Sequence, residues 1–210
     1  MKGLILSDFF MMKKTYAMYL LIGLVYTVIG VANKNSSMVT AFFILFGMMS
    51  TPTVFAWNEQ CKWDVYANTL PLRRKDYVGA KFVLGIMTMG AMLLWGAAVI
   101  IFNILVNHSS GEEELCVLAV TGAVGGIYMA ILFMLIFKLG VERSRIVMIA
   151  LYIIPFLTVM ALEKSGLIPE IPDMSSRMVW LAVGGLVLLA AVLMVVSYAV
   201  CLNIYKKKEL

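Results

Sequence analysis

The chain has 210 residues, of which 62% are hydrophobic and only 14% are charged. A soluble domain of this length could not cover its core with so little polar surface, so the composition predicts a protein that lies largely in lipid. The formal net charge of +5 does not indicate a nucleic-acid-binding protein, because the basic residues occur in short segments between apolar runs. We therefore expect one membrane domain over residues 1–210.

Six apolar stretches are long enough to cross a bilayer, since a helix of about 20 residues spans its hydrocarbon core. Each must be a helix, because a spanning segment has to satisfy its backbone hydrogen bonds internally. The predicted spans are residues 15–32, 38–57, 78–106, 115–138, 145–162 and 178–202. The expected fold class is thus an all-α integral membrane protein with six transmembrane helices, in which Pro52 and Pro155 kink their spans.

The basic residues predict the orientation of these spans. If the N-terminus lies inside, all of the 17 lysine and arginine residues except Lys34, Lys164 and Arg177 fall in cytoplasmic segments. An excess of this kind marks the cytoplasmic side of a membrane protein. Both termini are therefore predicted to be cytoplasmic, which fits an even number of spans.

The segment before the first span is expected to be an interfacial helix on the inner leaflet. Its broad apolar face would contain Ile5, Leu6, Phe9, Phe10 and Met12. The polar side, facing water, would contain Ser7, Asp8 and Lys14. A short extension of the first span is the alternative.

Aromatic and small residues recur along one stripe of the first span, because their spacing brings them to the same face of a helix. The stripe consists of Tyr16, Tyr19, Gly23, Tyr26 and Gly30. Small residues allow helices to approach closely, so the stripe predicts packing against another helix. A face lining a substrate cavity is the alternative. Gly122 and Gly126 in the fourth span predict a second close contact, within the protomer or across a dimer.

Residues 57–81 form the one long charged and aromatic interruption of the apolar sequence. We expect a short amphipathic helix over residues 58–71 that ends at Pro71. The following run of basic residues leads into the third span, with Asp76 as its expected N-cap.

The usual signatures of catalysis are missing from the sequence. It contains no phosphate-binding G-x-x-x-x-G-K-[ST] loop, no H-E-x-x-H and no G-x-S-x-G motif. His108 beside Glu112, Glu113 and Glu114 predicts a solvated acidic loop rather than a metal site, and the three cysteines have no metal-ligand spacing. We expect neither catalytic nor metal-binding residues nor a bound cofactor on this chain, so energy for any transport would come from another subunit.

Two runs of the sequence resemble a known family. The run TLPLRRKDYVGAK, residues 69–81, is similar to the "slP-x-x-R-x-x-y-v-x-x-K" signature of permeases of bacterial type-2 ATP-binding-cassette exporters. The opening MKGLILSD is similar to the family's "M-x-x-L-l-x-K-D" start, with Ser7 where lysine is common. Within the family, the chain looks most similar to permeases that export amphipathic peptides of the phenol-soluble-modulin kind.

The resemblance implies a half-transporter in the bacterial plasma membrane. Two permease subunits, expected here to form a homodimer, would build the pore, and two separate ATPase subunits would bind ATP and Mg. The segment between spans two and three would carry the coupling helix that docks on the ATPase. Its docking surface would comprise Glu59, Gln60, Lys62, Trp63, Asp64, Tyr66 and Asn68, and the turn back to span three would comprise Thr69, Leu70, Pro71, Arg73 and Arg74.

Other functions remain open at this point. The exported substrate could be a lipid or a drug in place of a peptide. Residues 57–81 could also bind a regulatory partner in a membrane sensor or scaffold that transports nothing. Finally, Arg73, Arg74 and Lys75 could bind anionic lipid headgroups, alone or in addition to ATPase docking.

Overall fold

The structure, a computed structural model, describes residues 2–33, 36–63, 74–107, 111–144, 146–147, 149–150, 153 and 176–207. In this part of the chain the long regular elements are all α-helices, which confirms the predicted helical class. They are α1 (Lys2–Met11), α2 (Lys13–Ala32), α3 (Ser36–Gln60), α5 (Arg74–Asn107), α6 (Gly111–Leu139) and α8 (Ser176–Lys207).

Four of these helices, α2, α5, α6 and α8, are long and apolar enough to cross a membrane. They contain the predicted first, third, fourth and sixth spans. The predicted second span lies in α3, which has 25 residues and contains Pro52. Most of the predicted fifth span, 145–162, falls outside the described residues, although residues 146–147, 149–150 and 153 are helical. The count of six spans therefore stays a prediction.

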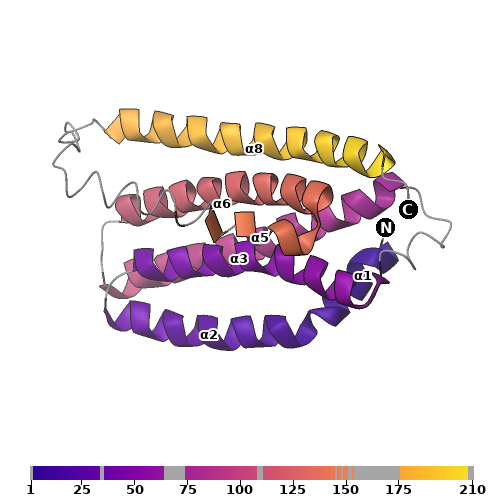
Figure 1. The fold of residues 1–210 in the computed structure, drawn as a ribbon. Helices are drawn as coiled ribbons and strands as arrows, with labels where there is room; N and C mark the ends of the chain where they lie inside the picture. Colours follow the sequence, from indigo (N-terminus) through magenta and orange to yellow (C-terminus); the bar gives the residue numbers. More distant parts are fainter. Residues whose placement is uncertain are drawn as a thin grey trace.

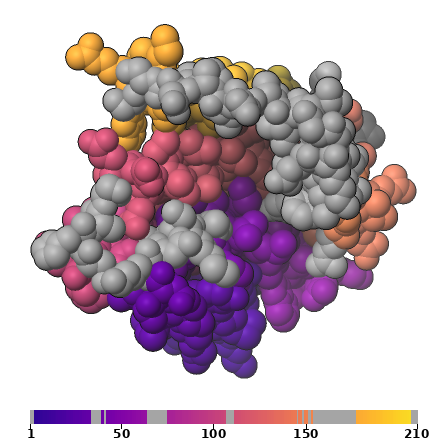
Figure 2. Space-filling view, turned by 90° about the vertical axis from the view of Figure 1, so that its left-hand side faces the viewer, coloured from indigo at the N-terminus to yellow at the C-terminus, as the bar shows by residue number. Residues whose placement is uncertain are grey.

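The long helices run roughly parallel or antiparallel to one another in a layered bundle (Figure 1). Helix α6 packs against α8 on one side and against α3 and α5 on the other, while α2 packs on α3. Viewed from the end, α8 and α2 lie on opposite sides of the bundle (Figure 2). Helix α1 is set at one end, where it contacts α5, α2 and α3.

The core of the bundle lies between α3, α5, α6 and α8. Phe133 of α6 is fully buried; its ring stacks on Phe82 of α5 at 4.1 Å between centroids and meets the edge of Phe55 of α3 at 6.0 Å. Between α8 and α6, the Ser197 hydroxyl donates a hydrogen bond of 2.7 Å to the backbone carbonyl of Ala130. Shape complementarity and such bonds hold helices together in lipid, where burial of apolar surface between helices contributes little.

Helix α1 lies at one end of the bundle, where α2 and α5 begin and where α3, α6 and α8 end (Figure 1). We call it the basic end, because exposed basic side chains lie there: Lys13, Lys14, Lys62, Lys75, Lys138, Arg143 and Lys206. This grouping brings together in space the segments that the charge pattern assigned to the cytoplasm. The orientation of the bundle in a membrane itself remains a prediction.

The predicted arrangement of the first helix was wrong for Asp8 and for Met12, which was expected on the apolar face with Phe9 and Phe10. Asp8, expected to face water, is only 1% exposed and points into the protein, as do Leu4 and Met12 at 7% and 0%. Leu4 and Asp8 share the inner face of α1, and Met12 lies in the turn between α1 and α2. The outer face instead carries Leu6, Phe9 and Phe10, all more than half exposed. Asp8 is buried because a distant cation pairs with it.

Candidate functional site

The end of α3 carries the described part of the predicted docking surface. Helix α3 runs to Gln60, and a turn follows in which the Lys62 amide donates to the carbonyl of Glu59 at 3.1 Å. Lys62 adopts a φ of 50°, a left-handed conformation that ends helices and costs a non-glycine residue about 1–2 kcal/mol. The turn leaves Glu59, Gln60 and Lys62 exposed. Trp63 is partly buried against the main core.

The rest of that predicted surface lies outside the described residues. This holds for Asp64, Tyr66, Asn68, Thr69, Leu70, Pro71 and Arg73. Arg74 is the first residue of α5. Because α5 begins at Arg74, Asp76 occupies its first turn and is not the N-cap that the sequence predicted. A carboxylate in a first turn still favours the helix, since it faces the positive end of the helix dipole.

A cavity of about 230 Å³ opens beside the end of α3. Its lining consists of Ala56, Glu59, Gln60, Val141 and Glu142. Ala56 and Val141 are buried, while both glutamates are exposed. The pocket therefore combines an apolar floor with two carboxylates.

The sequence reasoning missed the part that Glu142 plays in this surface. Helix α6 ends at Leu139, and Gly140 has a φ of 82°, a conformation that side chains rarely tolerate. This turn brings Val141 and Glu142 back against α3. A glycine followed by charged residues was a visible signal for a helix end, but nothing local indicated which helix the turn would meet.

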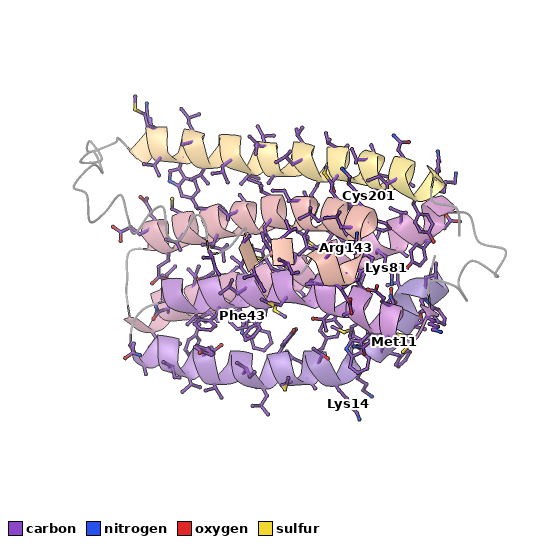
Figure 3. The ribbon with its side chains drawn as sticks, in the orientation of Figure 1. Met11, Lys14, Phe43, Lys81, Arg143 and Cys201 are labelled. Atoms are coloured by element: carbon purple, nitrogen blue, oxygen red, sulfur yellow. The ribbon has the colours of Figure 1, made fainter. Side chains whose placement is uncertain are left out.

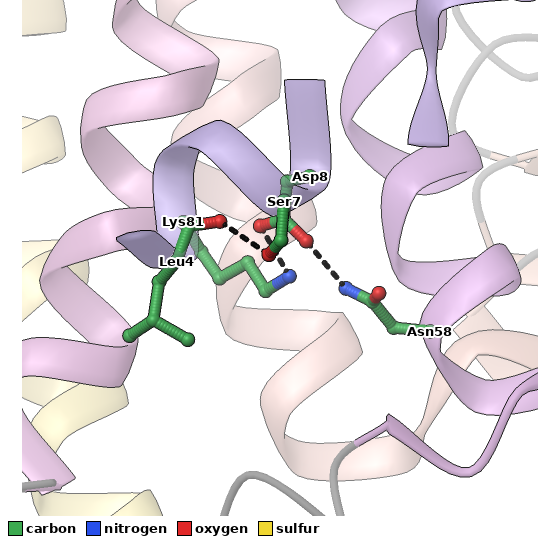
Figure 4. Close-up of polar contacts among 5 residues, drawn as sticks. All are labelled: Leu4, Ser7, Asp8, Asn58 and Lys81. Atoms are coloured by element: carbon green, nitrogen blue, oxygen red, sulfur yellow. Dashed lines mark hydrogen bonds and ion pairs between the residues drawn. The ribbon is translucent and has the colours of Figure 1, made fainter. Parts of the chain in front are cut away.

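Behind this surface lies a buried ion pair between α1 and α5. The Lys81 ammonium is 2.7 Å from Oδ2 of Asp8, and both side chains are 2% exposed (Figure 4). The Asn58 amide of α3 donates to Oδ1 of Asp8 at 3.3 Å. Lys81 also lies over the rings of Phe55 and Tyr77, at 5.5 and 5.4 Å from their centroids, where the ring faces attract a cation.

The charge pattern counted Lys81 among the cytoplasmic basic residues and did not indicate that it would be buried. Its side chain points into the bundle, whereas that of Lys14 points away from it (Figure 3). Charges leave water at a large cost unless they are paired and hydrogen-bonded. Here Asp8 supplies the opposite charge, Asn58 adds a donor, and two aromatic rings complete the surroundings.

The aromatic and glycine stripe of the first span lies against α3. Tyr19 stacks on Phe46 at 5.0 Å, and Tyr26 stacks on Phe42 at 4.0 Å. Gly23 and Gly30 are the two buried residues of α2. A Cβ at Gly23 would lie 2.7 Å from the ring of Phe43, so the glycine permits this close approach. Tyr16, at the start of the stripe, instead meets Phe9 of α1 at 5.5 Å.

The small residues of α6 make contacts within the protomer. A Cβ at Gly122 would lie 2.8 Å from Leu93 of α5, and a Cβ at Gly126 would lie 3.5 Å from Ala190 of α8.

The described residues contain no group of three or more histidine, cysteine, aspartate or glutamate side chains that could hold a metal ion. His108 lies outside the described residues.

Comparison with known protein families identifies the family of the chain. The model of the ABC-2 family transporter protein matches residues 3–206. The chain belongs to the ABC-2 transporter family. Searches of curated proteins and of solved structures found no significant match.

Membership in the ABC-2 family makes the chain a membrane component of an ATP-binding-cassette transporter. The ATPase of such a transporter is another subunit, so partnership with an ATPase follows from the family. The exposed end of α3 and the Asp8–Lys81 ion pair are thus parts of an ABC-2 permease.

Proposed function

We propose that the chain is one half of the membrane domain of an ATP-driven exporter and that its basic end docks on the ATPase. In this proposal the chain pairs with a second copy, its termini lie in the cytoplasm, and residues 59–74 with the coupling helix contact the ATPase. The amphipathic-peptide substrate is the finer part of the proposal and rests on the sequence resemblance alone.

The observation that carries the docking proposal is the convergence of separate segments at one end of the bundle. The end of α3 and the turn after α6 together line a pocket with two carboxylates, and α5 begins at the same end of the bundle (Figure 1). Protein interfaces commonly combine a few aromatic or arginine anchors with a polar rim. Trp63 and the pocket offer both features on a face that membrane lipid would not cover in the proposed orientation.

Docking is tested by co-expressing the chain with the ATPase encoded beside it and measuring the affinity of the purified components. We expect Trp63→Ala to weaken binding by about tenfold or more, as truncation of an interface anchor commonly does. Glu142→Gln should weaken binding several-fold and reduce its dependence on salt.

Matched controls lie at the opposite end of the bundle. Trp180 of α8 and Glu113 of α6 are exposed there, so Trp180→Ala and Glu113→Gln should leave ATPase affinity unchanged. If the ATPase does not co-purify with the wild-type chain, or if both pairs of variants behave alike, docking at the basic end is wrong.

The substrate is tested separately, with the permease and ATPase reconstituted in vesicles. A fluorescent amphipathic helical peptide should accumulate with ATP, whereas a scrambled peptide of equal composition should not. If a labelled phospholipid is translocated with ATP and the peptide is not taken up, the substrate is a lipid and the peptide proposal is wrong.

A further inference from the structure

Both flanks of the predicted docking segment contact one carboxylate of α1. Asn58 lies two residues before the end of α3, and Lys81 lies in the second turn of α5. The side chains of both bond to Asp8, one to each carboxylate oxygen. The two helices that flank the predicted docking segment are thus both joined to α1.

Apolar contacts next to α1 reinforce this junction. Met12, in the turn between α1 and α2, forms a buried cluster with Val54 of α3 and Leu84 of α5. Each partner lies within four residues of Asn58 or Lys81, so the apolar and charged contacts occupy the same turns of α3 and α5. Within the described residues, α1 contacts α5 most extensively and contacts α3 and α2 less.

The charged part of the junction fixes geometry more than it adds stability. A buried ion pair contributes little net free energy relative to apolar residues of similar shape, but separating its partners is costly. At 2.7 Å and 2% exposure, Asp8 cannot move away from Lys81 without breaking a buried ion pair, which is costly. Apolar side chains such as Met12 could slide more easily.

We propose that the Asp8–Lys81 ion pair is a latch that makes α1 move together with the first turns of α5 when the ATPase acts on the docking segment. The latch rests on the proposed function, because the ATPase supplies the movement. Its consequence is that the exposed face of α1, with Leu6, Phe9 and Phe10, is displaced in each ATPase cycle.

The latch is tested by hydrogen exchange of the permease–ATPase complex in lipid nanodiscs. The decisive variant is the double change Asp8→Asn and Lys81→Met, which removes both charges without leaving one unpaired. Its α1 amides should exchange about tenfold or more faster than those of the wild type, because local opening of α1 no longer separates an ion pair. Glu113→Gln, which removes an exposed charge of α6 at the opposite end of the bundle, is the control and should change nothing.

The coupled movement is tested by trapping the complex with ATP and vanadate. In the wild type, exchange in α1 and in residues 74–85 should change together on trapping, and in the double variant only residues 74–85 should respond. The latch is wrong if hydrogen exchange in α1 is the same in the double variant as in the wild type. It is also wrong if exchange in the wild-type α1 does not change on trapping. Loss of the ATPase from the wild-type complex would instead overturn the proposed function, and the nucleotide-free comparison would still decide whether the pair holds α1.

Discussion

The buried ion pair makes a quantitative prediction about the stability of the protein itself. Changing Lys81→Met removes the cation that pairs with the buried Asp8 carboxylate, and changing Asp8→Asn removes the carboxylate that pairs with the buried Lys81 ammonium. Removal of one partner of a buried pair typically costs about 3–5 kcal/mol. We expect each single variant to lose stability in this range.

The double variant Asp8→Asn/Lys81→Met should be more stable than either single variant. It contains no uncompensated charge, and apolar or neutral replacement of a whole buried pair is often close to neutral. The coupling free energy from the double-mutant cycle should therefore be at least about 2 kcal/mol. Both partners are 2% exposed, so raising the salt concentration should change this coupling little.

Equilibrium unfolding of the purified permease in mixed micelles measures these differences. Lys75→Met, which removes an exposed charge from the same helix, should stay within about 0.5 kcal/mol of the wild type. The reasoning fails if the two single variants lose as little as this control. It also fails if their losses simply add in the double variant, because an additive cycle means that the two side chains do not interact.

Two further predictions concern packing between the helices. Gly23→Ala would place a Cβ 2.7 Å from the buried ring of Phe43, so it should lower stability by about 1–3 kcal/mol despite the better helix propensity of alanine. The control is Gly90→Ala, whose Cβ would meet open space and which should be neutral or stabilising. Equal melting temperatures for the two variants would contradict the contact between Gly23 and Phe43. Ser197→Ala removes the 2.7 Å hydrogen bond between α8 and α6 and should lower stability by about 0.6 kcal/mol. The loss is measured as a lower melting temperature in detergent. An unchanged melting temperature would mean that the hydrogen bond contributes nothing to stability.

The positions of the long helices could be predicted because membrane helices carry a strong local signal. The expected span 15–32 lies within α2 (Lys13–Ala32), and 115–138 lies within α6 (Gly111–Leu139). A run of about 20 apolar residues has few alternatives in lipid. Helix ends were less accurate, since α5 continues to Arg74 among charged residues that carry no apolar signal.

The partners of each helix could not be predicted in the same way. The stripe of α2 indicated a close contact, but its counterparts Phe42 and Phe46 are ordinary apolar residues of α3. Likewise, Glu142 reaches the end of α3 only through the turn at Gly140. A local pattern shows that a face is suited to packing, and only the tertiary fold determines which face it meets.

Asp8 shows most clearly why local patterns fell short at the basic end. Its polarity placed it on the water-facing side of an interfacial helix, because an isolated carboxylate is costly to bury. Pairing with Lys81 offsets that cost, yet 73 residues separate the two in the chain. Both residues belong to the short runs that carried the family resemblance, the opening of the chain and residues 69–81. One residue of each run therefore pairs with one of the other, a contact that neither run indicates when it is considered alone.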